Sequence, residues 1–165
     1  MRRFRRGLVL LPVLLALIPA TARPSSAAVR QQAIGIHHLP TSPSSPVFSL
    51  GIRGGFSAGG SFTLTIYADG HLRLTKPPGG RFRLQNRKLQ LYLDALRGLL
   101  KLAEAEGFFS LPSQITGANP NPDASKIFIT VTTAEGAKSV TVLAAVVPAF
   151  DELYDVLTYT AGVTR

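Results

Sequence analysis

The chain has 165 residues, no cysteine and a formal net charge of +9. This length suits one domain, and the lack of thiols excludes disulfides and a cysteine-linked lipid anchor. The charge is concentrated at the start, because five of the 18 basic residues precede Val29. From Val29 onward 13 basic residues face nine acidic ones, a net charge of +4, which is too small a surplus to indicate a nucleic-acid-binding protein.

Residues 1–28 have the three-part pattern of a secretory signal peptide. Four arginines in the first six residues precede an apolar run from Gly7 to Ala20. Small-residue sites then allow cleavage after Ala22 or after Ala28. A membrane anchor is the alternative, but the run is about 14 residues long and a spanning helix needs roughly 20. We therefore expect export to the medium, the periplasm or the cell envelope, with no membrane association after cleavage.

Residues 29–46 are rich in proline and serine and lack apolar periodicity, which is typical of a spacer. His37 and His38 lie within it, but no third metal ligand is nearby, so we expect no metal site. The folded domain is expected to cover residues 47–163.

The domain begins with a strand and a hairpin. "VFSLGIR" at 47–53 and "SFTLTIY" at 61–67 alternate apolar and other residues, which predicts half-buried strands. Asp69-Gly70 is a two-residue turn signal, and "HLRLT" at 71–75 returns from it. His71, just after the turn, is expected to be solvated.

A long helix is predicted over residues 86–106, with Asn86 as its cap. Its apolar positions recur at spacings of three and four: Leu89, Leu93, Leu96, Leu100 and Ala103. A second hairpin follows in "KIFITVTT" and "KSVTV", and a final helix begins near Pro148. The order predicts an α+β fold, an antiparallel sheet of about four or five strands with the helices packed on one face.

The segment "GGFSAGG" at 54–60 places four glycines around Phe56. It is not a phosphate-binding loop, because it lies between two strands and no Lys-Ser or Lys-Thr follows it. A wide turn or bulge is a sufficient explanation for the glycines. The alternative is that Gly54 and Gly55 present Phe56 as an apolar contact for a partner.

A basic stretch follows the first hairpin. Six basic residues fall within 16 positions with no acid among them: Arg73, Lys76, Arg81, Arg83, Arg87 and Lys88. Such a run is usually a solvated face. The alternative is a surface for an acidic partner, in which Arg73, Arg81 and Arg83 are the candidate contacts.

Motifs for catalysis are missing from the sequence, which has neither Gly-x-Ser-x-Gly nor His-Glu-x-x-His. The acids of the last helix, Asp151, Glu152 and Asp155, lie in its first turns, where negative charge stabilises a helix. We therefore expect no enzymatic activity and no cofactor.

An ordered set of short motifs resembles the emfourin-type proteins, small bacterial inhibitors of thermolysin-like metalloproteases. The set spans about residues 48–160 and comprises "GGF", "LAEAEGFFSLPSQ", "NPDASKIFITVTT", "KSVTV" and "PAFDELYDVL". "SFTLTIYADGHLRLT" with "AEGFFSL" also resembles small secreted bacterial domains of unknown function.

The first resemblance implies a protein that blocks the cleft of an extracellular metalloprotease without chemistry of its own. Gly54, Gly55 and Phe56 match the "GGF" of that family. Thermolysin-like enzymes favour bulky apolar side chains beside the scissile bond, so Phe56 is the residue expected to occupy such a pocket. The second resemblance implies the alternative, an exported interaction or structural domain of the cell envelope with no protease target.

Overall fold

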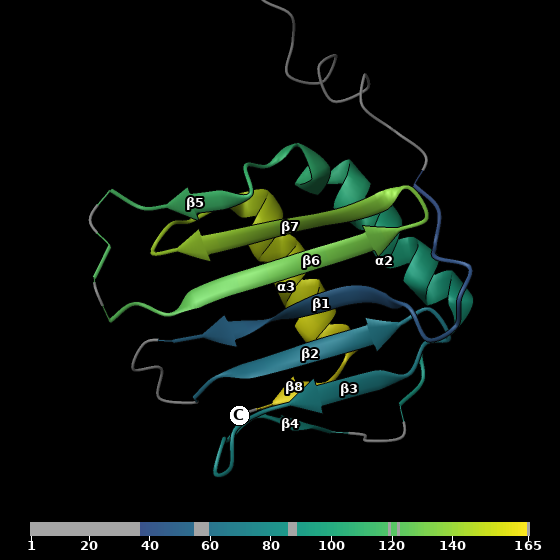
Figure 1. Cartoon of the computed structure of the whole chain (residues 1–165), viewed down its shortest axis with the longest axis horizontal. Helices are drawn as coiled ribbons and strands as arrows, with labels where there is room; N and C mark the ends of the chain where they lie inside the picture. The colour runs from purple at the N-terminus through teal and green to yellow at the C-terminus, as the bar shows by residue number, and fades with distance from the viewer. Residues whose placement is uncertain (1–36, 55–59, 86–88, 119, 122, 165) are drawn as a thin grey trace, which may run out of the picture.

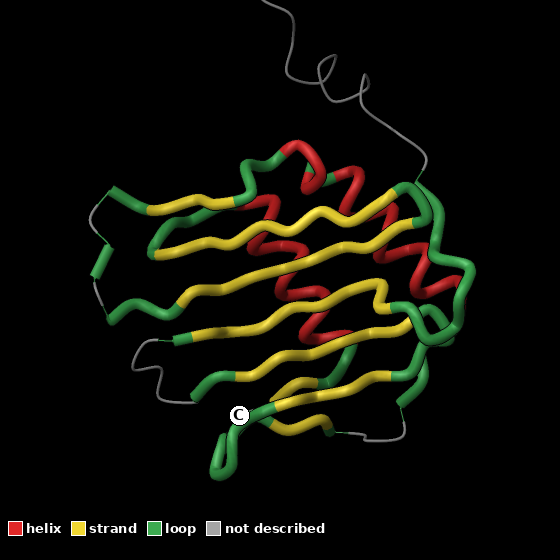
Figure 2. Tube along the Cα trace, in the orientation of Figure 1, coloured by secondary structure: helices red, strands yellow, loops and turns green. Residues whose placement is uncertain are grey.

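A six-stranded sheet forms one layer of the protein, in the strand order β3-β2-β1-β6-β7-β5 (Figure 1). The computed structural model describes residues 37–54, 60–85, 89–118, 120–121 and 123–164. The strands are β1 (Pro46–Arg53), β2 (Phe62–Tyr67), β3 (Leu72–Thr75), β5 (Gln114–Thr116), β6 (Lys126–Thr133) and β7 (Gly136–Leu143). The helices α2 (Leu93–Ala105) and α3 (Pro148–Thr160) both lie behind the sheet in this view, so among the described residues the other face carries no helix (Figures 1 and 2).

The α+β class is confirmed, but the sheet differs from the prediction in its strand number and in its direction. Four neighbouring pairs are antiparallel, whereas β5 runs parallel to β7. β5 escaped the sequence analysis because it is three residues long, with Ile115 as its one apolar side chain. Its position is set by pairing, since Gln114, Ile115 and Thr116 align with residues 141–143 of β7.

The core lies between the sheet and the helices. Phe48, Leu50 and Ile52 of β1 alternate toward it as predicted, and Phe62, Leu64 and Ile66 of β2 do the same. Burial of these side chains against the helices supplies the main driving force for folding. The face without helices is lined instead by the alternate residues, which are largely serine and threonine.

Helix α2 is shorter than predicted, because it begins at Leu93 and not near residue 86. Tyr92 has an extended backbone, and the amide of Leu91 donates to the carbonyl of Gly70 at 2.8 Å. Gln90 also forms an isolated antiparallel bridge with His71. Pairing with the first hairpin therefore replaces helix over residues 90–92, and the predicted cap Asn86 lies outside the described residues. Leu96, Leu100 and Ala103 are buried as the pattern predicts, whereas Leu93 is 47% exposed.

Helix α3 follows the prediction closely. Pro148 occupies its first turn, and Phe150, Leu153 and Leu157 are buried. Asp151 accepts a hydrogen bond from the amide of Val147 at 3.0 Å, which satisfies one donor at the start of the helix. After the helix, β8 (Val163–Thr164) pairs with β4 (Arg83–Leu84) in a two-stranded ribbon that the sequence analysis missed.

The last part of the predicted spacer contacts the domain. The amide of His37 donates to Glu104 of α2 at 2.7 Å, and the amide of Ala134 donates to the carbonyl of His38 at 2.8 Å. The ring of His37 lies 4.0 Å from that of Phe109, centroid to centroid. His37 and His38 are thus attached to α2 and to the turn between β6 and β7, whereas the carbonyls of Pro43 and Ser45 accept from the amides of Asp69 and Ala68 in the turn after β2.

Candidate functional site

One end of the sheet, which we call the glycine end, carries Gly54 and the end of the basic hairpin. β1 ends there at Arg53, which pairs with Lys126 at the start of β6. β2 begins and β3 ends at the same place, since Thr63 pairs with both Gly51 and Thr75. The antiparallel connections therefore bring the end of β1, before Gly54, and the end of β3 to one side of the molecule (Figure 1).

The two glycines that flank the undescribed residues 55–59 have positive φ angles. Gly54 has a φ of 67° and Gly60 a φ of 79°, in the left-handed region that side chains rarely adopt. Ser125 donates to the carbonyl of Gly54 at 3.1 Å, which ties this flank to the loop before β6. Gly55 and Phe56 lie outside the described residues, so the presentation of Phe56 to a partner stays a prediction.

Three residues of the basic stretch, Arg73, Lys76 and Arg83, line a groove beside β3. The hollow has a volume of about 660 Å³. We define the basic groove by its seven lining residues: Leu72, Arg73, Leu74, Lys76, Phe82, Arg83 and Leu84. The structure therefore brings Arg73 and Arg83 together with Lys76, whereas Arg81 is exposed but outside this lining. Arg87 and Lys88 fall outside the described part of the chain.

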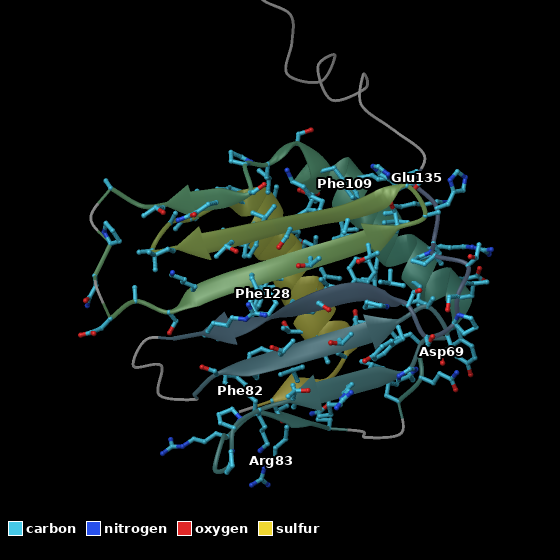
Figure 3. All side chains as sticks on the ribbon, in the orientation of Figure 1. Asp69, Phe82, Arg83, Phe109, Phe128 and Glu135 are labelled. Atoms are coloured by element: carbon cyan, nitrogen blue, oxygen red, sulfur yellow. The ribbon has the colours of Figure 1, made fainter. Side chains whose placement is uncertain are left out.

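The floor of the groove is apolar because the segment after the hairpin folds back under β3. Phe82 is 4% exposed, and its ring centroid lies 4.3 Å from that of Phe62 on β2. The β4–β8 ribbon holds this segment in place, and the amide of Gln85 donates to the carbonyl of Gly162 at 2.8 Å. Figure 3 labels Phe82 near the end of β3 and Arg83 below it.

The rim of the groove is positively charged, and the sequence segment that forms it contains no acidic residue. No acid occurs from Gly70 to Leu93. Asp69, just before this stretch, accepts from the amide of His71 at 3.0 Å and from its Nδ1 at 2.5 Å. The backbone hydrogen bond from His71 is the main cause that lowers the pKa of Asp69, so its carboxylate is already engaged in the turn. The groove is thus suited to anionic groups on an otherwise apolar ligand.

A second hollow, of about 270 Å³, lies at the glycine end on the face without helices. Arg53, Lys126 and Phe128 are among its lining residues. The guanidinium carbon of Arg53 is 4.2 Å from the centroid of the Phe128 ring. The sequence analysis missed this site. The signal in the sequence was Phe128, which alternates with the apolar core residues of its strand, together with the basic residues Arg53 and Lys126 at strand ends.

The histidines do not assemble a reactive centre in the described part of the chain. His38 donates from Nδ1 to Glu135 at 2.7 Å, and His71 is bonded to Asp69. Among the described residues no group of three or more His, Cys, Asp or Glu side chains could hold a metal ion. The same ranges contain no helix both long and apolar enough to cross a membrane.

The chain was compared with known protein families, with curated proteins and with solved structures, and none of the three comparisons finds a match.

Proposed function

We propose that this chain is an exported, non-catalytic domain that binds another protein through its glycine end. The observation that carries the proposal is the position of the basic groove, which reaches Lys76 at the same end of the sheet as Gly54. Protein interfaces use apolar pockets with a polar or charged rim, and this groove has both. The signal-peptide pattern of residues 1–28 supports export.

The non-catalytic part of the proposal rests on what the described side chains do. The carboxylates nearest the histidines, Glu135 and Asp69, are held in hydrogen bonds that fix local structure. Binding needs only shape and charge, and it requires no cofactor. A protein interface is therefore the simplest use of the basic groove and of Gly54, which both lie at the glycine end.

The most concrete form of this function is inhibition of a thermolysin-like metalloprotease. The motif resemblance supports this form, with Gly54, Gly55 and Phe56 as the "GGF" residues. Phe56 would enter an apolar pocket beside the catalytic cleft, and Arg73, Arg81 and Arg83 would contact acidic side chains around it.

Titration of the purified chain against a thermolysin-like protease tests this form. Peptide cleavage should fall as the chain is added. Phe56→Ala should weaken inhibition by at least about 1–2 kcal/mol, the usual scale for an interface anchor. Tyr159→Ala is the matched control, since Tyr159 is an aromatic side chain of α3 that is 88% exposed. It should leave the inhibition constant unchanged.

Unchanged cleavage at micromolar excess of the chain removes the inhibitor proposal. The alternative is then the exported interaction domain of the cell envelope. Inhibition that survives Phe56→Ala but weakens in high salt would shift the contact to the arginines, because salt screens exposed charges.

A further inference from the structure

The second hollow, on the face of the sheet without helices, carries two cations that no acidic side chain of the protein neutralises. We call it the Arg53 hollow and define it by its lining residues: Arg53, Ser113, Gln114, Lys126, Phe128, Thr141 and Leu143. Arg53 of β1 and Lys126 of β6 are direct partners in the antiparallel register. All nine acidic residues of the sequence lie within the described ranges, and none of them forms an ion pair with either cation.

The placement of two like charges opposite one another works against the pairing of β1 with β6. Directly opposed residues on neighbouring strands have their Cβ atoms about 4.5–5.5 Å apart, and like charges there are destabilising. Asp123 is the nearest acid along the chain, three residues before Lys126, but it is exposed and makes no ion pair with it. A bound anion would remove the repulsion between Arg53 and Lys126. The pair is therefore better suited to a ligand than to the stability of the sheet.

The guanidinium of Arg53 is held in place by a ring contact that does not use up its hydrogen-bond donors. Its central carbon lies 4.2 Å from the centroid of the Phe128 ring, and that side chain is 7% exposed. A guanidinium has five N–H donors, and no described residue accepts a hydrogen bond from those of Arg53. A side chain already fixed by a neighbour loses less conformational freedom when it binds a ligand. Arg53 is thus a preorganised donor for an anion.

Uncharged polar residues complete the lining of the Arg53 hollow. Thr141 of β7 lies opposite Phe128 on one side and Gln114 of β5 on the other, and Ser113 precedes Gln114. Hydroxyl and amide side chains of this kind donate hydrogen bonds to anionic oxygens. The volume of about 270 Å³ is below the roughly 300–1,000 Å³ of pockets for drug-sized ligands, so the hollow suits one small group.

We propose that the Arg53 hollow binds a doubly charged tetrahedral oxyanion, namely the phosphate group of a phosphomonoester or free phosphate. Arg53 donates to two of its oxygens, as the planar fork of a guanidinium allows, and Lys126 supplies a second positive charge. Thr141 and Gln114 donate to the remaining oxygens. The charge of the pair selects phosphate, because a dianion neutralises both cations whereas one carboxylate leaves one of them unpaired. This inference goes beyond the proposed protein interface, since it needs no partner protein.

The charge of the ligand gives a first test, because a phosphomonoester loses its second proton near pH 6. The charged groups that face the hollow are Arg53 from β1 and Lys126 from β6, and β5 and β7 contribute no titratable side chain to the lining. Arginine and lysine keep their charge between pH 5 and 7, and the carboxylate of Asp123 stays ionised there. Affinity for glycerol phosphate should therefore rise about five- to tenfold from pH 5 to pH 7. Affinity for sulfate, a dianion at both pH values, should stay constant.

Amide NMR titration of the purified full chain with glycerol phosphate, inorganic phosphate, sulfate and acetate measures these affinities. Saturable shifts should concentrate on residues 126–128 and 141–143, and acetate should bind at least about tenfold more weakly than glycerol phosphate, since it carries half the charge. Tighter binding of glycerol phosphate than of inorganic phosphate identifies a phosphomonoester as the ligand. The reverse order identifies free phosphate.

Neutral substitutions locate the site on the protein. Arg53→Gln with Lys126→Gln should weaken binding of glycerol phosphate at least about tenfold, because it removes both charges. Lys126→Gln alone leaves the contact between Arg53 and Phe128 in place, so it tests the site even if the double variant does not fold. It should weaken binding severalfold and reduce the dependence on pH. Arg97→Gln with Lys101→Gln is the matched control, since both side chains are exposed on α2, and it should leave binding unchanged.

The outcomes are independent of whether a protease is inhibited. Saturable binding that rises with pH and is weakened by Lys126→Gln supports the inference, even if the chain inhibits no protease. Equal affinity for acetate, an affinity for glycerol phosphate that does not change with pH, or no saturable shift at millimolar concentration would each overturn it. Shifts that concentrate on residues 73–76 and persist in Lys126→Gln would place the anion in the basic groove, and this result would overturn it as well.

Discussion

Gly51 of β1 lies directly opposite Phe128 of β6, on the face of the sheet that carries no helix (Figure 3). Phe128 is nonetheless only 7% exposed. Arg53 lies over the Phe128 ring, with its guanidinium carbon 4.2 Å from the ring centroid. A Cβ at Gly51 would be 2.0 Å from the carbonyl oxygen of Phe62, so glycine is required there for the strands to approach. The open face thus has a small buried site of its own, separate from the core.

Removal of this ring should destabilise the protein even though it lies outside the core. Phe128→Ala is expected to lower the free energy of unfolding by about 3 kcal/mol, near the lower end for buried phenylalanines. Arg53→Ala should cost about 0.5–1 kcal/mol, the scale of an exposed cation–π contact. Urea denaturation of both single variants and the double variant measures these losses. Strictly additive losses would contradict a direct contact between the two side chains.

Phe62 and Phe82 should show a similar coupling beneath the basic groove. Their ring centroids are 4.3 Å apart with a tilt of 43°. Such aromatic pairs contribute about 0.5–1.5 kcal/mol beyond the area that they bury. A double-mutant cycle with Phe62→Leu and Phe82→Leu, followed by urea denaturation, should give a coupling energy in this range. A coupling near zero would mean that the floor of the groove is held by the β4–β8 ribbon alone.

Gly70 should not tolerate a side chain. It has a φ of 84°, and an added Cβ would lie 1.9 Å from the carbonyl oxygen of Leu91. Gly70→Ala should lower the free energy of unfolding by roughly 1–3 kcal/mol, since it combines backbone strain with a steric clash.

Gly98→Ala is the matched control for this change. Gly98 lies within α2, and an added Cβ there would meet no atom within 4 Å. Alanine is the better helix former by about 0.5–1 kcal/mol, so this variant should be more stable than the parent chain. Thermal or urea unfolding of the two variants should therefore shift in opposite directions, and a shared direction would contradict the argument.

The attachment of His38 to the turn between β6 and β7 should weaken in acid. The side-chain hydrogen bond from His38, aided by its backbone amide, lowers the pKa of Glu135 from 4.5 to about 2. A carboxyl whose pKa is lower in the folded state stabilises that state above its unfolded pKa. This contribution is therefore complete above pH 4.5 and is lost as the pH falls toward 2.

NMR titration of the Glu135 carboxyl group measures the effect directly. Its midpoint should lie near 2 in the parent chain and rise in His38→Ala, which keeps the backbone donor but loses the ring. The amide signal of His38 should move with the same midpoint. Glu152→Gln is the control, because Glu152 is exposed on α3 and should leave both titrations unchanged. An unshifted Glu135 midpoint in His38→Ala would contradict the assigned cause.

Local patterns predicted those elements in which one face meets the core and the other meets solvent. The alternation of Phe62, Leu64 and Ile66 was sufficient for β2, and Pro148 with its apolar face was sufficient for α3. Leu89 and Leu93 continued the helical spacing of α2, yet the hydrogen bond between Leu91 and Gly70 competes with helix there. That contact joins residues 21 apart, so no local pattern reveals it.

The sequence predicted which residues take part in the basic groove, but only partly which of them lie together in space. The clustering of Arg73, Lys76 and Arg83 followed from their nearness in sequence. The meeting of Arg53 with Phe128 depends on the register between β1 and β6. Register is a property of the assembled sheet, because a shift of one residue turns every side chain to the other face.

The hydrogen bonds of His37 and His38 to Glu104 and Glu135 also determine which end of the domain faces a support when the protein is immobilised through residues ahead of His37. β6 spans eight residues from the glycine end to the turn that holds these histidines, a separation of roughly 25 Å. A bead or a reporter protein linked ahead of His37 would therefore be attached at the end of the sheet opposite the glycine end. The glycine end would then face away from the support. Linkage through the other terminus has the opposite effect, because Thr164 is paired with Arg83 and would bring the support beside the groove.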